Sequence, residues 1–209
     1  MRTAPNVLWL ESHRLRAGSG PEVRFDRPLS GLPTEDQLAQ ALTALEPGPT
    51  AWVVDDQLAP SVLLRDVAEL PEGTEAREAF WRWKLQQTMA LEAPHAVQAQ
   101  PLEPGLWLAA GIREDWRETW MGLAQRLERP LHRLEPRWLH LYNRLAPTQE
   151  TPGLLLSLSP AGSGRYTGTL VGWSHALCLL RSWSEPLDAS DWQLERLAPS
   201  IAYLQREGK

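Results

Sequence analysis

The chain has 209 residues, of which 43% are hydrophobic and 22% are charged, and its formal net charge is −5. These values are typical of a soluble globular protein of one or two domains, and the negative charge argues against nucleic acid or an anionic membrane as a direct partner. The sequence has no apolar run near the ~20 residues that span a bilayer, and no signal-peptide core. The single cysteine, Cys178, excludes an internal disulfide and fits a reducing cytoplasm.

The first part of the chain reads as strands followed by a helix. Thr34 and Gln37 have the spacing of a capping box, and apolar residues recur at helical spacing after them up to Leu45. Asp55 and Asp56 are expected to form a solvated strand end, because no second chemical signal lies nearby in the sequence. Short apolar or alternating runs predict strands at residues 7–10, 13–17, 22–27, 51–55 and 61–66.

The middle of the chain predicts a helix over 72–89, a short loop, a strand from Leu106, and then a helix, a strand and another helix up to Leu145. The helix over 72–89 has two apolar faces. It is therefore either sandwiched within the chain, which we favour, or it meets another protein with one face. Phe80 and Trp83 are on the face assigned to the core, together with Trp116 and Trp120 elsewhere. The face assigned to contact consists of Trp81, Leu85 and Met89.

The last part repeats the order of the first. Strands are predicted at 153–159, 165–172 and 175–183, with a hairpin turn over 160–164. Ser190, with Gln193 three residues later, has the spacing of a cap for the final helix. Two blocks of strands followed by a helix predict a duplicated α/β fold with mixed sheets.

Four short strings make the chain similar to the PilM family, the actin-like cytoplasmic proteins of type IV pilus systems related to FtsA and to the cytoplasmic part of GspL. The strings are LLRDVAELP (63–71), LWLAAG (106–111), LEP (134–136) and LAPSIAYL (197–204). The resemblance implies an actin-like, ribonuclease H-like α/β fold with mixed sheets. Its expected parts are a first domain of residues 1–66 and 135–147, an inserted α/β subdomain of 67–134, and a reduced second domain of 153–209.

The chain departs from the nucleotide-binding pattern of that fold. Actin-like ATPases hold phosphates on two hairpin turns, each with an acidic residue and a glycine. The corresponding turns here are LESH (10–13), which has no glycine, and SLSP (157–160), which has no carboxylate and carries a proline in place of an N–H donor. The chain also stops before the glycine-rich adenosine segment, which a piece cut from a longer protein would mimic. We therefore expect a shortened relative that binds no nucleotide or other cofactor.

Other chemistry has little support in the sequence. The histidines, at 13, 95, 132, 140 and 175, are scattered and have no cysteine pairs nearby, so no metal site is expected. No G-x-S-x-G motif indicates a hydrolase. Cys178 lies in an apolar strand and is interpreted as a core residue.

The resemblance implies a non-catalytic adaptor that is cytoplasmic and is held at the inner membrane through its partner. That partner would be the cytoplasmic tail of a PilN-like bitopic membrane protein, bound between the first domain and the inserted subdomain, and self-association is possible. The residues expected to bind it are Trp81, Leu85 and Met89, with Arg65 as a weaker candidate. The alternatives are an actin-like ATPase and an FtsA-like division or cytoskeletal protein.

Overall fold

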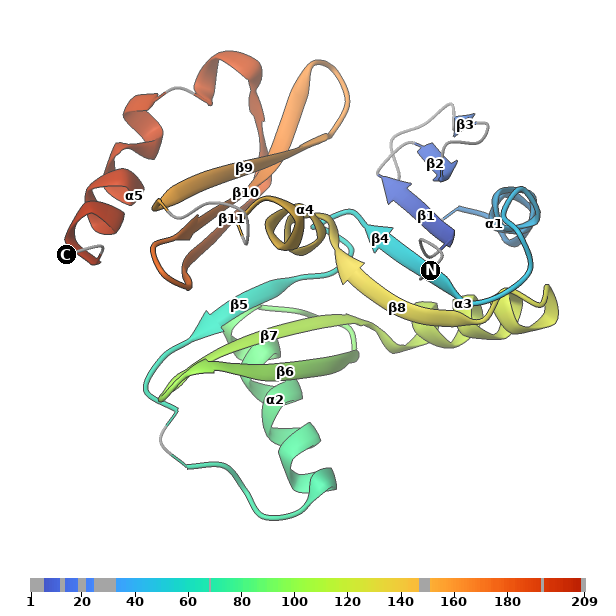
Figure 1. The fold of residues 1–209 in the computed structure, drawn as a ribbon, viewed down its shortest axis with the longest axis horizontal. Helices are drawn as coiled ribbons and strands as arrows, with labels where there is room; N and C mark the ends of the chain where they lie inside the picture. Colours follow the sequence, from blue (N-terminus) through green and yellow to red (C-terminus); the bar gives the residue numbers. More distant parts are fainter. Residues whose placement is uncertain are drawn as a thin grey trace.

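The chain forms three β-sheets with helices packed between and around them (Figure 1). The computed structural model describes residues 6–11, 14–18, 22–24, 33–67, 69–146, 151–192 and 194–207. Of residues 22–24, 194–196 and 207 only the backbone is described. The first two residues of the predicted turn over 10–13 are therefore seen, while Ser12 and His13 lie outside the described residues.

The first sheet is mixed and has the strand order β3-β2-β1-β4-β8. Strand β4 runs parallel to both β1 and β8, whereas β1, β2 and β3 are antiparallel. All five residues of β4 are buried, as expected for a central strand that is covered on both faces. The strands are β1 (Asn6–Glu11), β2 (Arg14–Ala17), β3 (Glu22–Arg24), β4 (Thr50–Val54) and β8 (Leu131–Pro136).

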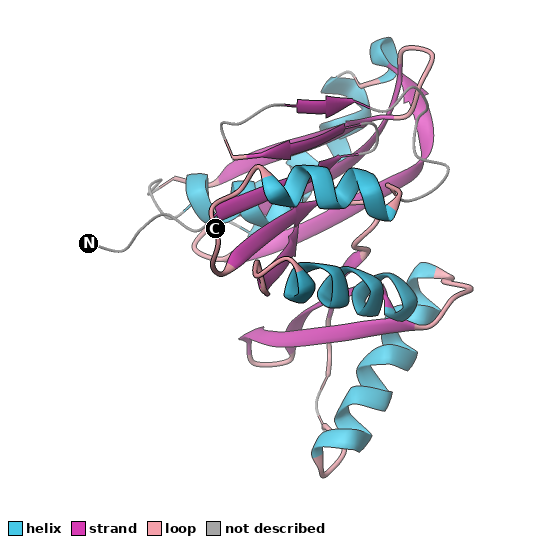
Figure 2. Cartoon of the chain, turned by 90° about the vertical axis from the view of Figure 1, so that its right-hand side faces the viewer, coloured by secondary structure: helices cyan, strands magenta, loops and turns pink. Residues whose placement is uncertain are grey.

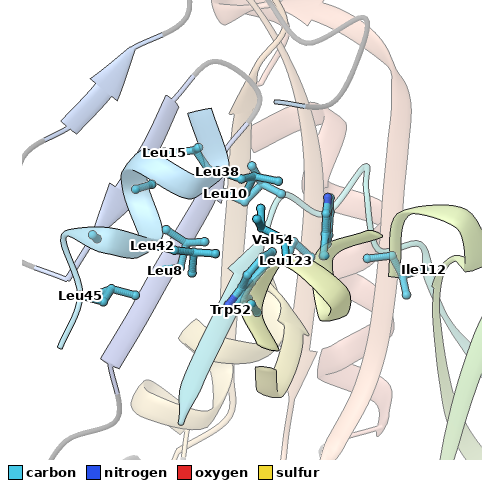
Figure 3. Packing of buried hydrophobic residues seen from close by; sticks show 14 of the residues in the cluster. Leu8, Leu10, Leu15, Leu38, Leu42, Leu45, Trp52, Val54, Ile112 and Leu123 are labelled. Atoms are coloured by element: carbon cyan, nitrogen blue, oxygen red, sulfur yellow. The ribbon is translucent and has the colours of Figure 1, made fainter. Parts of the chain in front are cut away.

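Helices α1 (Glu35–Thr43) and α3 (Glu114–Arg126) cover one face of this sheet. The predicted capping box is confirmed, since the Gln37 N–H donates to Thr34 Oγ1 and the Thr34 N–H donates to Gln37 Oε1. Figure 3 shows the core between them, where leucines of β1 and α1 meet Trp52 of β4 and Leu123 of α3. Helix α4 (Arg137–Leu145) lies on the other face, where His140 meets Trp9 edge to face at 4.9 Å.

The second sheet is antiparallel, with the order β5-β7-β6, and carries helix α2 on one face. Trp81 and Leu85 of α2 are its buried residues, and the Trp81 ring lies 4.7 Å from that of Trp107. A side chain at Gly111 would come within 2.5 Å of Leu85 Cδ2, so this glycine lets α2 approach the sheet. Figure 2 shows α2 standing beside the sheet at one end of the molecule. The elements are β5 (Ser61–Leu64), α2 (Thr74–Met89), β6 (His95–Glu103) and β7 (Leu106–Arg113).

Two elements share a sheet or a core with segments outside their predicted domain, and a third was not predicted as a strand. Strand β5 was expected in the first domain but pairs with β7 in the second sheet. Helix α3 was expected in the inserted subdomain but buries Trp120 and Leu123 in the core of the first sheet. Strand β6 occupies most of the segment that was predicted to be a loop.

The third sheet is antiparallel, with the order β11-β10-β9, and lies between α4 and α5. Val171 packs with Trp138 of α4, while a side chain on the neighbouring Gly172 would meet Leu204 of α5 at 2.7 Å. The glycine therefore lets α5 lie close to the sheet. The elements are β9 (Gly153–Pro160), β10 (Arg165–Trp173), β11 (Leu177–Asp188), a 3-10 turn (Ala189–Asp191) and α5 (Leu194–Glu207).

The predicted hairpin between β9 and β10 is confirmed. Ala161 N–H donates to Arg165 O, and φ is positive from Gly162 to Gly164. The SLSP segment at 157–160 lies within β9, before this turn. Ser190 lies in the 3-10 turn ahead of α5, while Gln193, its predicted capping partner, lies outside the described residues.

Candidate partner-binding groove

A groove with a volume of about 580 Å³ runs between the first sheet and the second. We call it the seam groove. Strand β8 and helix α3 line one side of it, and β6, β7 and α2 line the other. Its apolar lining consists mostly of small or short side chains, with Met121 of α3 exposed at 40%. These apolar residues are Ala59, Ala96, Val97, Ala110, Gly111, Ile112, Met121, Leu131, Leu134 and Pro136.

Two strands at the seam groove have an edge without a strand partner among the described residues. Strand β8 pairs only with β4, and β6 pairs only with β7. An unpaired edge presents backbone N–H and C=O groups that can hydrogen-bond an added extended segment. The groove therefore combines backbone edges with a floor of small apolar residues, while most of its exposed lining surface is polar.

Charged side chains form the rim of the seam groove. Arg82 of α2 and Glu114 of α3 make an ion pair at 2.9 Å, which joins the two helices across the rim. Both side chains are well exposed, so the pair contributes little to stability and can exchange partners. Glu78, Arg117 and His132 are also exposed on the rim.

The residues predicted to contact a partner do not line this groove. Trp81 is 6% exposed and Leu85 is fully buried, because both pack against the second sheet, and Met89 is partly buried at the end of α2. Trp83, which was assigned to the core, is 49% exposed. Trp81, Leu85 and Trp83 thus lie opposite to their predicted places, whereas Phe80, also assigned to the core, is partly buried and packs against the core of the second sheet. Trp81 and Leu85 have almost no exposed surface with which to contact a partner.

Arg65, the weaker candidate, joins the second sheet to the third. Its guanidinium donates to Cys178 O at 2.8 Å and to Tyr203 Oη at 2.6 Å, and it also lies over the Tyr203 ring. Arg65 therefore links the end of β5 to β11 and α5. The structure places none of the four predicted residues in the seam groove.

A second polar site, which we call the junction, lies buried between the first and third sheets. Asp55 and Asp56 follow β4, Arg137 begins α4, and Ser157 and Ser159 lie on β9. The Arg137 guanidinium donates to Ser157 Oγ at 3.1 Å and to Ser159 Oγ at 2.6 Å, and Ser159 Oγ donates to Asp55 Oδ1 at 3.0 Å. The expectation of a solvated strand end at Asp55 and Asp56 is wrong, since they are only 1% and 8% exposed.

The electrostatics of the junction centre on Asp56. Its Oδ1 accepts the Trp138 N–H at 2.8 Å at the start of α4. Burial raises the pKa of Asp56 from 3.8 to about 6, although Arg137, the Trp138 N–H and Ser157 oppose the rise, and the charge of Asp55 adds to it. One carboxylate oxygen of each aspartate is buried without a hydrogen-bond partner among the described residues.

The described part of the chain contains neither a cluster of metal ligands nor a membrane-spanning helix. No group of three or more histidine, cysteine or acidic side chains there could hold a metal ion. None of the described helices has the length and apolar character needed to cross a membrane.

The fold is similar to a solved one, although the sequence matches neither a family model nor a curated protein. A solved structure of the PilM-PilN type IV pilus biogenesis complex superposes with a TM-score of 0.62 at 14% identity, over 97% of this chain and 67% of that one. This chain has a PilM-like fold. The α/β architecture with mixed sheets that the sequence predicted is thereby confirmed, while membership of the PilM family and a shortened second half stay predictions.

The seam groove was missed because nothing in the local sequence marks it. Its two edge strands, β6 and β8, are separated by a strand and a helix, and β6 was predicted to be a loop. Arg117 and Met121 on α3 are spaced to share a helix face. A methionine exposed on that face was the one available signal.

Proposed function

We propose that this chain is a non-catalytic adaptor in a type IV pilus or type II secretion-like inner-membrane platform. In this proposal it lies on the cytoplasmic face and binds an extended cytoplasmic segment of a PilN-like bitopic membrane protein in the seam groove. The observation that carries the proposal is the groove itself, which has small apolar residues on its floor and is lined by two strands that each have an unpaired edge among the described residues. The fold shared with the PilM-PilN structure supports it.

The lining of the seam groove suits an extended peptide better than a compact ligand. Alanines and Gly111 on the floor leave room for a backbone, which could add to the edge of β6 or β8. The flexible side chain of Met121 can change its rotamer to pack against an apolar residue of the bound peptide. The exposed rim charges would set the partner's orientation and its rate of association more than the affinity. Nothing in this mode of binding requires a cofactor.

Calorimetry with a synthetic peptide of the PilN-like protein's cytoplasmic tail tests the proposal. We expect Met121→Asp to weaken binding at least about tenfold, since it places a charge on the apolar floor and a tenfold change corresponds to about 1.4 kcal/mol. Leu154→Asp is the matched control. Leu154 is equally apolar and 37% exposed, but it lies on β9 outside the groove. Equal affinities for the two variants would show that the tail binds elsewhere.

The rival classes make different predictions. An actin-like ATPase must be stabilised by Mg-ATP at many times its Kd, whereas we expect no change in melting temperature at millimolar Mg-ATP. An FtsA-like polymer would scatter more light as its concentration rises, and we expect no filaments. A stabilising shift with Mg-ATP would replace the adaptor with a nucleotide-binding function.

A further inference from the structure

The junction is a network of hydrogen bonds between residues from both halves of the molecule. The two carboxylates belong to the end of β4 in the first sheet, and the two serine hydroxyls belong to β9 in the third sheet. Arg137 spans them, with a further hydrogen bond of 2.5 Å to Leu158 O. Any change in the angle between the two sheets must therefore break hydrogen bonds at the junction.

The charges within the junction do not balance when both aspartates are ionised. Two carboxylates then share one guanidinium in a site from which water is excluded. A buried charge that is not fully compensated can be relieved by admitting water or by taking up a proton. Moving β9 away from the end of β4 would admit water, because Ser159 of β9 hydrogen-bonds to Asp55 there. Taking up a proton requires no movement.

We propose that the junction is a pH-sensitive clasp: protonation of Asp56 holds the first and third sheets at one fixed angle, and its ionisation lets them move apart. The pKa of Asp56, raised to about 6 by burial, puts this change near neutral pH. Asp56 Oδ1 can accept a hydrogen bond from the Trp138 N–H whether the carboxyl is protonated or ionised. The first turn of α4 therefore keeps this hydrogen bond at both values of pH.

The charged groups that act on Asp56 are few. Arg137 from α4 favours its ionised form, and Asp55 from its own segment disfavours it, while β9 contributes the neutral Ser157. The nearest histidine on α4, His140, is hydrogen-bonded through Nδ1 to Glu135 at 2.7 Å, on the side of α4 where it meets Trp9. A substitution at Asp56 therefore isolates the contribution of this carboxyl.

Spin-label distances between the two halves test the clasp. The labels would be placed by Gln40→Cys on α1 and Ser184→Cys on β11, both exposed, in a Cys178→Ser background. We expect a narrow distance distribution at pH 5 and a distribution at pH 8 that is broader or longer. Asp56→Asn imitates the protonated carboxyl and should keep the narrow distribution at both values of pH.

Two further variants keep the test decisive. Ser159→Ala removes two hydrogen bonds across the clasp without changing a charge and should broaden the distribution already at pH 5. Asp66→Asn is the control, since Asp66 is exposed and its positive φ suits asparagine, and it should behave like the unsubstituted chain. Identical distributions at pH 5 and pH 8 in the unsubstituted chain would overturn the proposal. So would a pH response that survives Asp56→Asn.

Discussion

The seam groove and the junction both lie where the first sheet meets another sheet, but they use charge in opposite ways. In the groove the charged side chains are exposed, and the ion pair of Arg82 with Glu114 is open to water. In the junction the charged groups are buried, and Arg137 already hydrogen-bonds to serines of the same chain. The groove can therefore exchange its partners for those of another molecule, whereas the junction already holds its own.

This difference separates recognition from internal structure within one fold. An apolar floor with exposed rim charges can accept a partner without unfolding anything. A buried and mostly satisfied polar set instead specifies how two sheets are joined, and it makes that joining sensitive to the loss of a single group. The two regions also meet in the sequence, because Pro136 lines the groove and Arg137 belongs to the junction.

The largest expected effect compares one arginine from each region. Arg137→Met should lower the free energy of unfolding by about 3–5 kcal/mol, since it leaves two buried carboxylates without their cation. Arg117→Met, on the groove rim, should change it by less than about 0.5 kcal/mol. Urea denaturation of both variants measures the difference. Similar values for the two would mean that the junction is no more ordered than the rim.

The same contrast can be tested within α2. Trp81→Ala should destabilise the chain by about 3–5 kcal/mol, because it leaves a cavity against Trp107 in the second sheet. Trp83→Ala removes an equally large side chain that is 49% exposed and should cost less than about 1 kcal/mol. Thermal melts of the two variants check this. If Trp83→Ala were the more damaging, the face of α2 turned toward the sheet would be the one that the sequence first indicated.

A pH dependence of stability is the next effect in size. Because the pKa of Asp56 is about 6 in the folded chain and 3.8 without its surroundings, the folded chain binds more protons between these values. The stabilisation that comes from Asp56 is complete below pH 3.8 and is lost as the pH rises through about 6. The loss is at most ~3 kcal/mol, at 1.36 kcal/mol per pKa unit. Asp56→Asn should remove this component from unfolding measured between pH 4 and 8. An unchanged slope would assign the dependence to other groups.

The smallest effect is expected at the rim of the groove. A double-mutant cycle with Arg82→Ala and Glu114→Ala should give a coupling of about 0.2–1 kcal/mol in low salt, and less at 1 M salt, where exposed charges are screened. A coupling above about 2 kcal/mol would show that this pair holds the groove closed and is not freely exchangeable.

Local signals in the sequence predicted the elements well where a short segment carries all the information. The capping box at Thr34 and Gln37 is such a case, because both of its hydrogen bonds lie within one turn. Strand β6 was missed because Gln98, Gln100 and Pro101 are exposed and polar or strand-breaking, which resembles a loop. Its place in a sheet depends on pairing with β7, which a short window does not reveal.

The candidate sites depended on residues far apart in the sequence. For α2, both faces carry a tryptophan, and the choice between them rests on the space that Gly111 leaves for Leu85. The partners of Asp55 and Asp56 on α4 and β9 lie 82 to 104 residues further along the chain, so their burial could not be inferred from neighbours. The order of elements was sufficient to predict the fold, but not the surfaces on which function depends.

The most direct test of the proposed function is hydrogen–deuterium exchange with and without the PilN-like tail peptide. Exchange reports which backbone N–H groups become hydrogen-bonded, and the unpaired edges of β6 and β8 should be unprotected in the free chain. We expect the peptide to slow exchange over His95–Glu103, Leu131–Pro136 or both, and to leave the exposed face of α2 around Trp83 unchanged. Protection confined to α2 or to the third sheet, with both edge strands unaffected, would contradict the seam groove as the binding site.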